Sequence, residues 1–243
     1  MESALRRYNG KALINSVNGK EESMHAILPL VKKYGGVVVA LTLDEGVIPA
    51  TAEGRVAIAK RILSVAESYG IAKKDIIFDT LTMTVSADPQ AAGVTLASLR
   101  RIREELGCHT SLGVSNVSFG LPAREALNST FFAMALENGL SAAILNPHSA
   151  EMMRVYYAYR ALREQDENCA DYIAHVPALM PAAAAATATA PATPGAAASE
   201  EGSELHRAIT RGLREQAVSL TEALLKTEAP LEIINREVIP ALD

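Results

Sequence analysis

The sequence predicts an α/β fold, because short apolar runs alternate with helical patterns along roughly the first 176 residues. The runs are apolar throughout, which is typical of parallel strands buried on both faces. Strands of this kind that alternate with helices indicate repeated βα units. Five units occupy about 150 residues, whereas a complete eight-unit barrel takes about 250. We therefore predict a partial (β/α)8 (TIM-type) barrel of about five βα units.

The strands and helices follow from particular stretches. The five predicted strands are ALINS (12–16), GVVVALTLD (36–44), DIIFD (75–79), SLGVSN (111–116) and AAILN (142–146). Between them and after them, apolar side chains recur on one helical face. These are Met24, Ile27, Leu28 and Val31; Ala59, Ile62, Leu63 and Ala66; Leu99, Ile102 and Leu106; Leu127, Phe131 and Met134; and Met153, Tyr156 and Tyr157. Gly35 and Gly36 precede a strand and are interpreted as a helix C-terminal stop.

The composition changes at Pro177, which predicts three regions along the chain. Residues 1–176 form the partial barrel, and residues 177–202 are an Ala/Pro/Thr-rich segment expected to be an extended linker. Residues 203–243 contain a helical stripe followed by a second helix that Pro230 opens, since proline suits a first helical turn. The stripe consists of Leu205, Ile209, Leu213, Ala217, Leu220 and Leu224.

Composition excludes several classes of function. The 243-residue chain is 49% apolar with a net charge of −5 and lacks the basic stripe that nucleic-acid partners need. No apolar run approaches membrane-spanning length, and no signal peptide is predicted. The two cysteines, Cys108 and Cys169, form no CxxC pair, which fits the cytoplasm. The five histidines show no metal-ligand spacing, so no metal site is predicted.

Polar side chains follow every predicted strand. They are Asn15 and Ser16, Asp44 and Glu45, Asp79, Ser115 and Asn116, and Asn146. Each alone is explained by turns and helix caps, which favour Asn and Asp. The whole set predicts a polar site, because the carboxyl ends of parallel strands lie on one rim. Carboxylates accept from ring N–H groups and amides both donate and accept, so this rim suits a neutral, nitrogen-rich heterocycle.

The same rim argues against other chemistry. No His, Cys or Lys follows any of the strands, so a Ser-His or Cys-His nucleophile pair has no support. Ser115 and Ser118 lack a G-x-S-x-G elbow and are interpreted as turn residues. No glycine-rich phosphate loop follows a strand.

ALINS, VVALTLDE, DIIFD, LGVSNVSFGLPARE and AAILNP, in this order and spacing, resemble the pterin-binding domain of cobalamin-dependent methionine synthases and of methyltetrahydrofolate:corrinoid methyltransferases. The resemblance covers about residues 4–165. The tail PLEIINREVIPALD is similar to the helical cap that begins the cobalamin-binding module of the same proteins.

The resemblance implies a barrel that binds 5-methyltetrahydrofolate at its rim and passes the methyl group to cob(I)alamin, in methionine synthesis from homocysteine. It implies that Asn15 and Asp79 hydrogen-bond the pterin ring and that Asn116 lies beside the methyl-bearing nitrogen as the catalytic residue. Gly113 and Arg124 would line the pterin pocket. Asp44 and Asn146 are expected on the rim as further binding residues.

A neutral amide suits this reaction. A tertiary amine leaves well only if it is protonated as the methyl departs. An amide accepts from the protonated nitrogen or donates to the unprotonated one, so Asn116 stabilises growing charge without titrating itself.

The resemblance also implies parts that this sequence does not contain: three earlier barrel strands, an aspartate on them, and the cobalamin-binding fold. We therefore expect a corrinoid-binding module as partner, and a chain supplying the missing strands as a further one. Two alternatives stay open. The chain is a non-catalytic or complementation-dependent pterin-binding fragment, or it is a pterin enzyme resembling dihydropteroate synthase, for which Arg124 alone gives weak support.

Overall fold

The computed structural model describes residues 1–45, 47–180, 203–210 and 213–242. The chain divides into two compact units, Met1–Leu179 and Met180–Asp243. Most of the predicted linker, residues 181–202, lies outside the described residues.

A five-stranded parallel sheet forms the centre of the first unit, with the strands in chain order. The strands are β1 (Leu13–Val17), β2 (Val37–Leu41), β3 (Ile76–Asp79), β4 (His109–Gly113) and β5 (Ala142–Ile144). Parallel pairing of consecutive strands requires a crossover after each one, and helices provide it. The predicted α/β fold with a partial barrel of five strands is confirmed.

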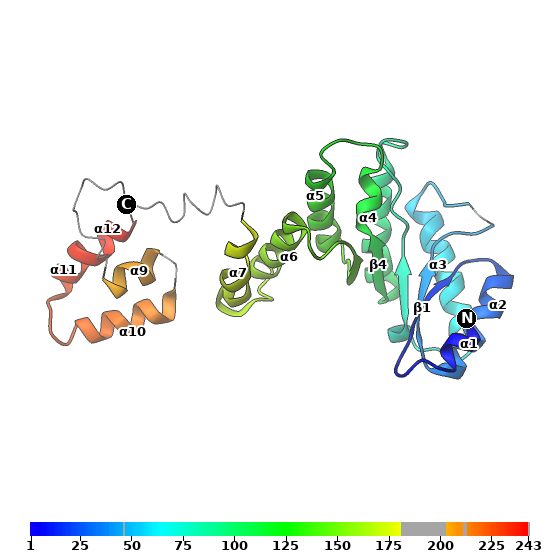
Figure 1. Ribbon diagram of the computed structural model, residues 1–243, viewed down its shortest axis with the longest axis horizontal. Coiled ribbons are helices and arrows are strands. Elements are labelled where there is room, and N and C mark those ends of the chain that lie inside the picture. Colours follow the sequence, from blue (N-terminus) through cyan, green and yellow to red (C-terminus); the bar gives the residue numbers. More distant parts are fainter. Residues whose placement is uncertain (46, 181–202, 211–212, 243) are drawn as a thin grey trace. The chain divides into compact units, whose positions relative to one another are not determined.

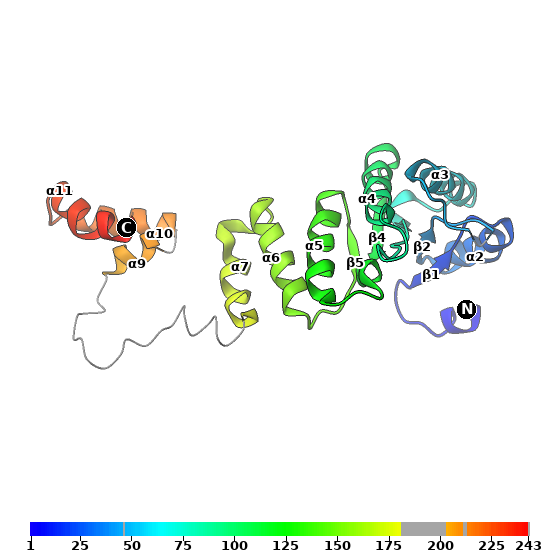
Figure 2. The same cartoon turned by 90° about the horizontal axis from the view of Figure 1, so that it is seen from above.

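Helices follow the strands in turn, and consecutive helices lie side by side (Figures 1 and 2). The longer ones are α2 (Glu21–Tyr34), α3 (Ala52–Ser68), α4 (Ala91–Arg101), α5 (Arg124–Glu137) and α6 (Ala150–Leu162). The shorter segments are α1 (Glu2–Leu5), η1 (Lys73–Asp75), the π-helical turn η2 (Ile102–Leu106), η3 (Val114–Ser118), η4 (Glu167–Cys169), α7 (Ala170–His175) and η5 (Pro177–Leu179).

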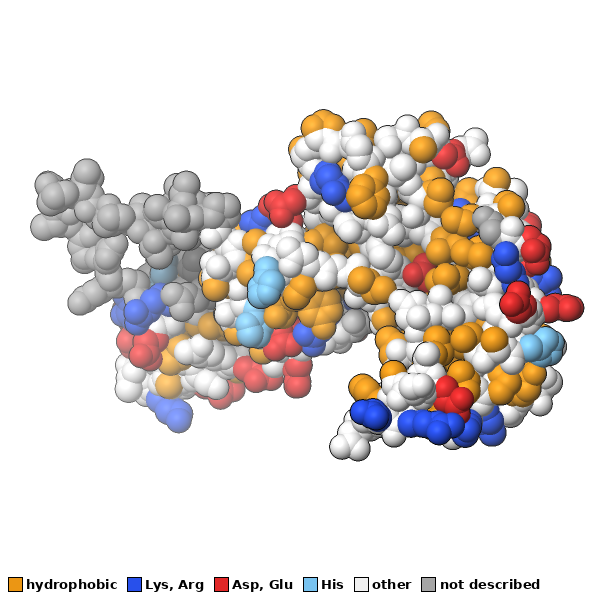
Figure 3. Space-filling view, turned by 45° about the vertical axis from the view of Figure 1, so that its right-hand side comes forward, with side chains coloured by type: hydrophobic (Ala, Val, Ile, Leu, Met, Phe, Trp, Pro, Cys, Tyr) orange, Lys and Arg blue, Asp and Glu red, His pale blue; other side chains and the backbone are white. Residues whose placement is uncertain are grey.

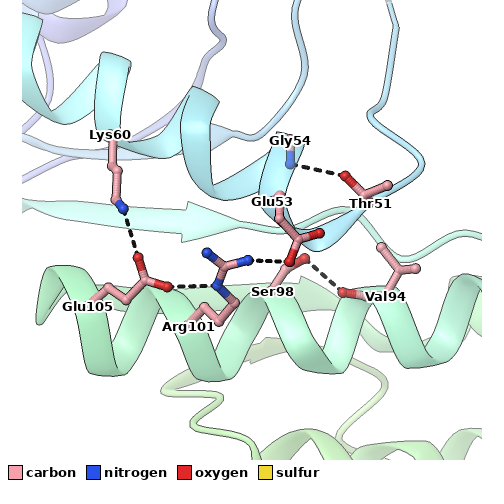
Figure 4. Close-up of polar contacts among 8 residues, drawn as sticks. All are labelled: Thr51, Glu53, Gly54, Lys60, Val94, Ser98, Arg101 and Glu105. Carbon is pink, nitrogen blue, oxygen red and sulfur yellow. Dashed lines mark hydrogen bonds and ion pairs between the residues drawn. The ribbon is translucent and has the colours of Figure 1, made fainter.

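Local chemistry explains where these helices begin and end. Gly35 ends α2 in the left-handed conformation at φ 66°, which confirms the predicted glycine stop. The Thr51 hydroxyl accepts from the Gly54 N–H at 3.1 Å and caps α3. An ion pair at 2.6 Å between Glu53 and Arg101 joins the first turn of α3 to the last turn of α4, and Arg101 forms a second ion pair at 2.6 Å with Glu105 of η2 (Figure 4).

The core lies between the sheet and its helices in two clusters. One surrounds β1 to β3 and includes Ile14, Val38 and Phe78, and the other surrounds β4 and includes Leu112 and Phe131. The predicted buried faces of α2, α3 and α4 hold, since Leu28, Ile62 and Leu99 are fully buried. The face predicted for α5 is partly wrong: Leu127 and Met134 are exposed, while Phe132 and Ala135 are buried beside Phe131. Apolar residues surround most of α5, so periodicity alone does not fix its inner face.

Both edges of the sheet lack such cover. Leu13 on β1 is 59% exposed and Ile144 on β5 is 57% exposed. Neither edge strand pairs with a further strand among the described residues. Apolar side chains are visible on the surface of the molecule in Figure 3. An open parallel sheet with bare edges is what five units of an eight-unit barrel leave.

The second unit is a small helical group: α9 (Glu204–Thr210), α10 (Arg214–Leu224), α11 (Pro230–Ile233), the π-helical turn η6 (Ile234–Val238) and α12 (Ile239–Leu242). The predicted stripe is therefore split between α9 and α10, and Pro230 opens α11 as predicted. Leu205, Ala208 and Ile233 are buried, and the Ser203 hydroxyl donates to the buried Glu237 carboxylate.

Candidate functional site

A cavity of about 470 Å³ opens at the carboxyl ends of β3 and β4. It is lined by Ile48, Asp79, Leu81, Thr82, Met83, Gly113, Ser115, Asn116 and Ile144. Three of the predicted site residues, Asp79, Gly113 and Asn116, therefore meet in one place. The strand order explains the meeting, because β3 and β4 are neighbours in the sheet and their ends share one rim.

Asp79 is the last residue of β3 and pairs in register with Leu41 and Ser111. Its main-chain carbonyl accepts from the Thr42 N–H at 3.1 Å. Its side-chain Oδ1 accepts from the Leu81 N–H at 2.8 Å. Burial raises the pKa of Asp79 to about 6, against the lowering effects of the Leu81 N–H and of the Arg55 charge. This carboxyl is thus poised to change charge near neutral pH.

Asn116 lies on η3, directly after β4. The sequence predicted a strand through residue 116, but β4 ends at Gly113 and the chain then turns tightly. The turn points the exposed Asn116 side chain into the cavity. A strand would have alternated its side chains across the sheet, so the 3-10 turn is what sets the direction of this amide.

The η3 turn is fixed by Arg124 at the start of α5. Its Nη2 donates to the Ser115 carbonyl at 2.8 Å and its Nε donates to the Ser118 hydroxyl at 2.9 Å. That hydroxyl donates onward to Asn128 Oδ1 at 2.7 Å. The Arg124 guanidinium also lies over the Phe119 ring, 4.7 Å from its centroid. Arg124 therefore holds the turn, and it lines a separate hollow at the start of α5 rather than the cavity with Asp79.

Asn15 lies outside this cavity. It lines a separate groove of about 360 Å³ between α1 and β1. It pairs with Val39 while Asp79 pairs with Leu41, and those partners are two residues apart on β2. Asn15 and Asp79 therefore point to the same face of the sheet, with Asn15 farther from the rim.

The two remaining predicted residues have partners outside the cavity. Asp44 forms an ion pair with Arg61 at 2.5 Å, and its Oδ1 accepts from the Glu45 N–H at 3.0 Å. The Asn146 Oδ1 accepts from the His148 N–H at 3.0 Å, as a turn residue before α6 does. The structure brings neither of them into the cavity.

Thr82 and Arg55 contribute to this region without having been predicted. Thr82 lines the cavity, and its buried hydroxyl has no hydrogen-bond partner in the described part of the chain. Its place in the loop after DIIFD was the available signal. Arg55 precedes Ala59, Ile62 and Ala66 on the buried stripe of α3, so an arginine at an apolar position was the signal for it.

Across the described ranges, no group of three or more His, Cys, Asp or Glu side chains is placed to hold a metal ion. In those same ranges, no helix has the length and apolar character that a membrane span requires.

Comparison with known proteins places this geometry in context. Residues 1–146 match the model of the pterin binding enzyme family. Methylcorrinoid:tetrahydrofolate methyltransferase of Eubacterium limosum is 32% identical over 163 residues, which is 66% of this chain and 60% of that protein. Methionine synthase of Mycobacterium tuberculosis is 35% identical over 159 residues, covering 60% of this chain and 13% of that protein. Methionine synthase of Mycobacterium leprae is 33% identical over 168 residues, covering 64% of this chain and 14% of that protein. The chain thus spans 60% or less of the length of these relatives.

Proposed function

Because the chain belongs to the pterin-binding enzyme family, we propose that it binds 5-methyltetrahydrofolate in the cavity at the ends of β3 and β4. We further propose that it serves methyl transfer from this folate to a corrinoid, in the synthesis of methionine from homocysteine. The observation that carries the proposal is that Asp79, Gly113 and Asn116 line one cavity. The names of the relatives, which include a methylcorrinoid:tetrahydrofolate methyltransferase, support the reaction.

The cavity offers the two kinds of partner that a pterin ring needs. The Asp79 carboxylate accepts hydrogen bonds, which suits the ring N–H and amino groups. Asn116, which lines the same cavity, carries both a donor and an acceptor. The apolar walls, Ile48, Met83 and Ile144, suit the faces of a flat ring.

In the proposed transfer, the bond between N5 and the methyl carbon breaks and the electron pair stays on N5. A proton delivered to N5 from solvent offsets the charge that develops there, and the Asn116 amide oxygen accepts a hydrogen bond from that protonated nitrogen. The acceptor, a reduced corrinoid carried by another module, supplies a nucleophilic cobalt when it is bound. We assign residues 203–243 to the start of the helical cap of such a module.

The bare sheet edges favour a second candidate, in which this chain binds pterin only after complementation. We propose that three further βα units pair with β1 and β5 and cover the exposed Leu13 and Ile144. Whether these units lie on the same polypeptide or on a partner chain does not alter the geometry, since both edges accept parallel strands.

Calorimetric titration with 5-methyltetrahydrofolate tests the proposal. We expect saturable binding that is weakened at least about tenfold in D79N, since a charge-assisted hydrogen bond contributes about 1.5–3 kcal/mol. N138A is the matched control, because Asn138 is half-buried just after α5 and, within the described residues, its amide donates to the Met134 carbonyl at 2.8 Å. Equal binding by D79N and wild type would contradict the proposed site. Binding that appears only after a chain with the three missing units is added would favour the second candidate.

A further inference from the structure

Arg55 is a buried arginine whose partners are almost all main-chain carbonyls. Only 2% of it is exposed. Its Nε donates to the Pro49 carbonyl at 3.0 Å. Its Nη1 donates to the carbonyls of Thr80 at 2.6 Å and Leu81 at 2.9 Å. Among the described residues, no carboxylate forms an ion pair with it.

This arrangement is costly, which indicates a role beyond packing. A buried charge without an ion-pair partner loses its hydration, and an apolar residue at this position of α3 would pack at lower cost. Burial lowers the pKa of Arg55, and the nearby charges of Asp88 and Asp79 oppose that effect. The guanidinium is aimed at the two loops whose residues Ile48, Leu81 and Thr82 line the cavity.

One peptide group connects Arg55 to Asp79. The Thr80 carbonyl and the Leu81 N–H belong to the same peptide unit. Arg55 donates to the carbonyl oxygen of this peptide unit. The N–H of the same unit, that of Leu81, donates to Asp79 Oδ1 at 2.8 Å. Hydrogen bonds in such a chain polarise one another. The Arg55 cation therefore strengthens the hydrogen bond that the Asp79 carboxylate accepts from the Leu81 N–H. The Arg55–Leu81 carbonyl bond fixes the next peptide unit as well.

We propose that Arg55 is a positioning residue for the pterin site, which orients the Asp79 carboxylate and favours its ionised form through the Thr80–Leu81 peptide. This inference rests on the proposed function only where it concerns pterin. Within the described chain, Arg55 is the cation whose charge lowers the pKa of Asp79. Its strand neighbours Leu41 and Ser111 are uncharged, and His109 lies two residues before Ser111 on the same face of β4.

The test is a 13C NMR titration of the Asp79 carboxyl in the ligand-free full chain, with D79N used to assign the resonance. In R55Q we expect the titration midpoint to rise by at least about one pH unit, because a nearby opposite charge has been removed. R103Q is the matched control. Arg103 also donates to a main-chain carbonyl, that of Cys108 at 3.0 Å, at the amino end of β4. The titration midpoint of Asp79 in R103Q should equal that in wild type.

An unchanged midpoint in folded R55Q would overturn the inference. If R55Q does not fold, R55K decides, since lysine keeps the charge but not the fork that spans Pro49, Thr80 and Leu81. R55K should raise the midpoint by less than R55Q is expected to, and no change at all would overturn the inference.

Binding of 5-methyltetrahydrofolate across pH 5–8.5 completes the test. The affinity of R55Q should fall about threefold relative to wild type near pH 6.5 and about tenfold near pH 5, and it should approach wild type at pH 8.5, where the carboxyl is ionised in both. A merely structural role would weaken binding equally at every pH, which would contradict the inference. If wild type binds no folate, the proposed function fails, and the NMR titration still judges Arg55 separately.

Discussion

A β-carbon on Gly113 would lie 3.0 Å from the Nδ2 atom of Asn116. Gly113 has a negative φ of −78°, so a side chain at this position would be opposed by crowding against Asn116 rather than by backbone strain. The spacing of GVSN therefore has a physical reason: the strand ends on a residue without a side chain so that the amide three positions later fits against it.

Gly113→Ala should weaken folate binding about 3- to 10-fold by displacing the Asn116 amide, a loss of about 0.7–1.4 kcal/mol. Titration calorimetry measures this. Gly93→Ala is the control, because nothing lies within 4 Å of its β-carbon position on α4. That variant should bind normally and be more stable by about 0.5–1 kcal/mol. Normal binding by both variants would show that the close approach to Asn116 is unimportant.

Asn116→Ala should lower the rate of methyl transfer about 10- to 100-fold while weakening folate binding less. The amide is proposed to stabilise charge that develops only as the methyl group departs, so its removal acts mainly on the transition state. Single-turnover kinetics with a reduced corrinoid acceptor, compared with equilibrium titration, separates the two effects. Equal losses in rate and affinity would indicate that Asn116 only positions the pterin.

Asp79→Asn should stabilise the fold at neutral pH while it weakens binding. The pKa of Asp79 in the folded chain is about 6, above its usual value of 3.8. As the pH rises through this window, the unfolded chain releases the proton first, so the folded state loses stability relative to it. Asn avoids this penalty, which is at most about 3 kcal/mol for a two-unit difference. Thermal unfolding should show D79N above wild type at pH 7.5, with the electrostatic gain absent below about pH 4. The same gain at both pH values would contradict an ionised, buried Asp79.

Arg124→Gln should weaken folate binding about tenfold, because the η3 turn loses two hydrogen bonds that fix Ser115 and Ser118. Arg124→Lys should restore little of it, since one ammonium group does not reproduce the planar fork. Calorimetric titration of both variants measures the loss. Arg163→Gln serves as the control, because within the described residues Arg163 forms an exposed ion pair with Glu137 at 3.8 Å and lies outside the η3 turn. If R124Q binds folate as tightly as wild type, the η3 turn does not contribute to folate binding.

The spacing of apolar residues and the composition predicted the strands and most of the buried helix faces. Buried parallel strands and the apolar faces of helices both produce regular patterns in a sequence. Gly35 and Pro230 marked helix ends correctly since their backbone preferences are local. The strand after residue 108 was predicted too far along the chain. Val114 continues the apolar run of β4, and the turn that follows depends on the tertiary bonds of Arg124.

Within the candidate site, sequence reasoning placed Asp79 and Asn116 on the rim because strand ends are readable. It could not separate Asn146, which only supports a turn, from residues that face the cavity. Nor could it rank Asn15, whose depth in the sheet depends on the register of β1 against β2. The Arg55 contacts join three segments, so no local pattern contains them.

The parallel direction of the sheet determines how copies of this chain can associate. Where the three further units do not cover the sheet, the exposed edge of β5 in one molecule is complementary to the exposed edge of β1 in the next, so self-pairing is head-to-tail. Two five-stranded sheets together contain ten strands, whereas a closed (β/α)8 barrel contains eight, so such pairing does not close a barrel. The expected product is an open chain of molecules that lengthens with concentration, and sedimentation velocity should show a continuous rise in mass rather than a discrete dimer.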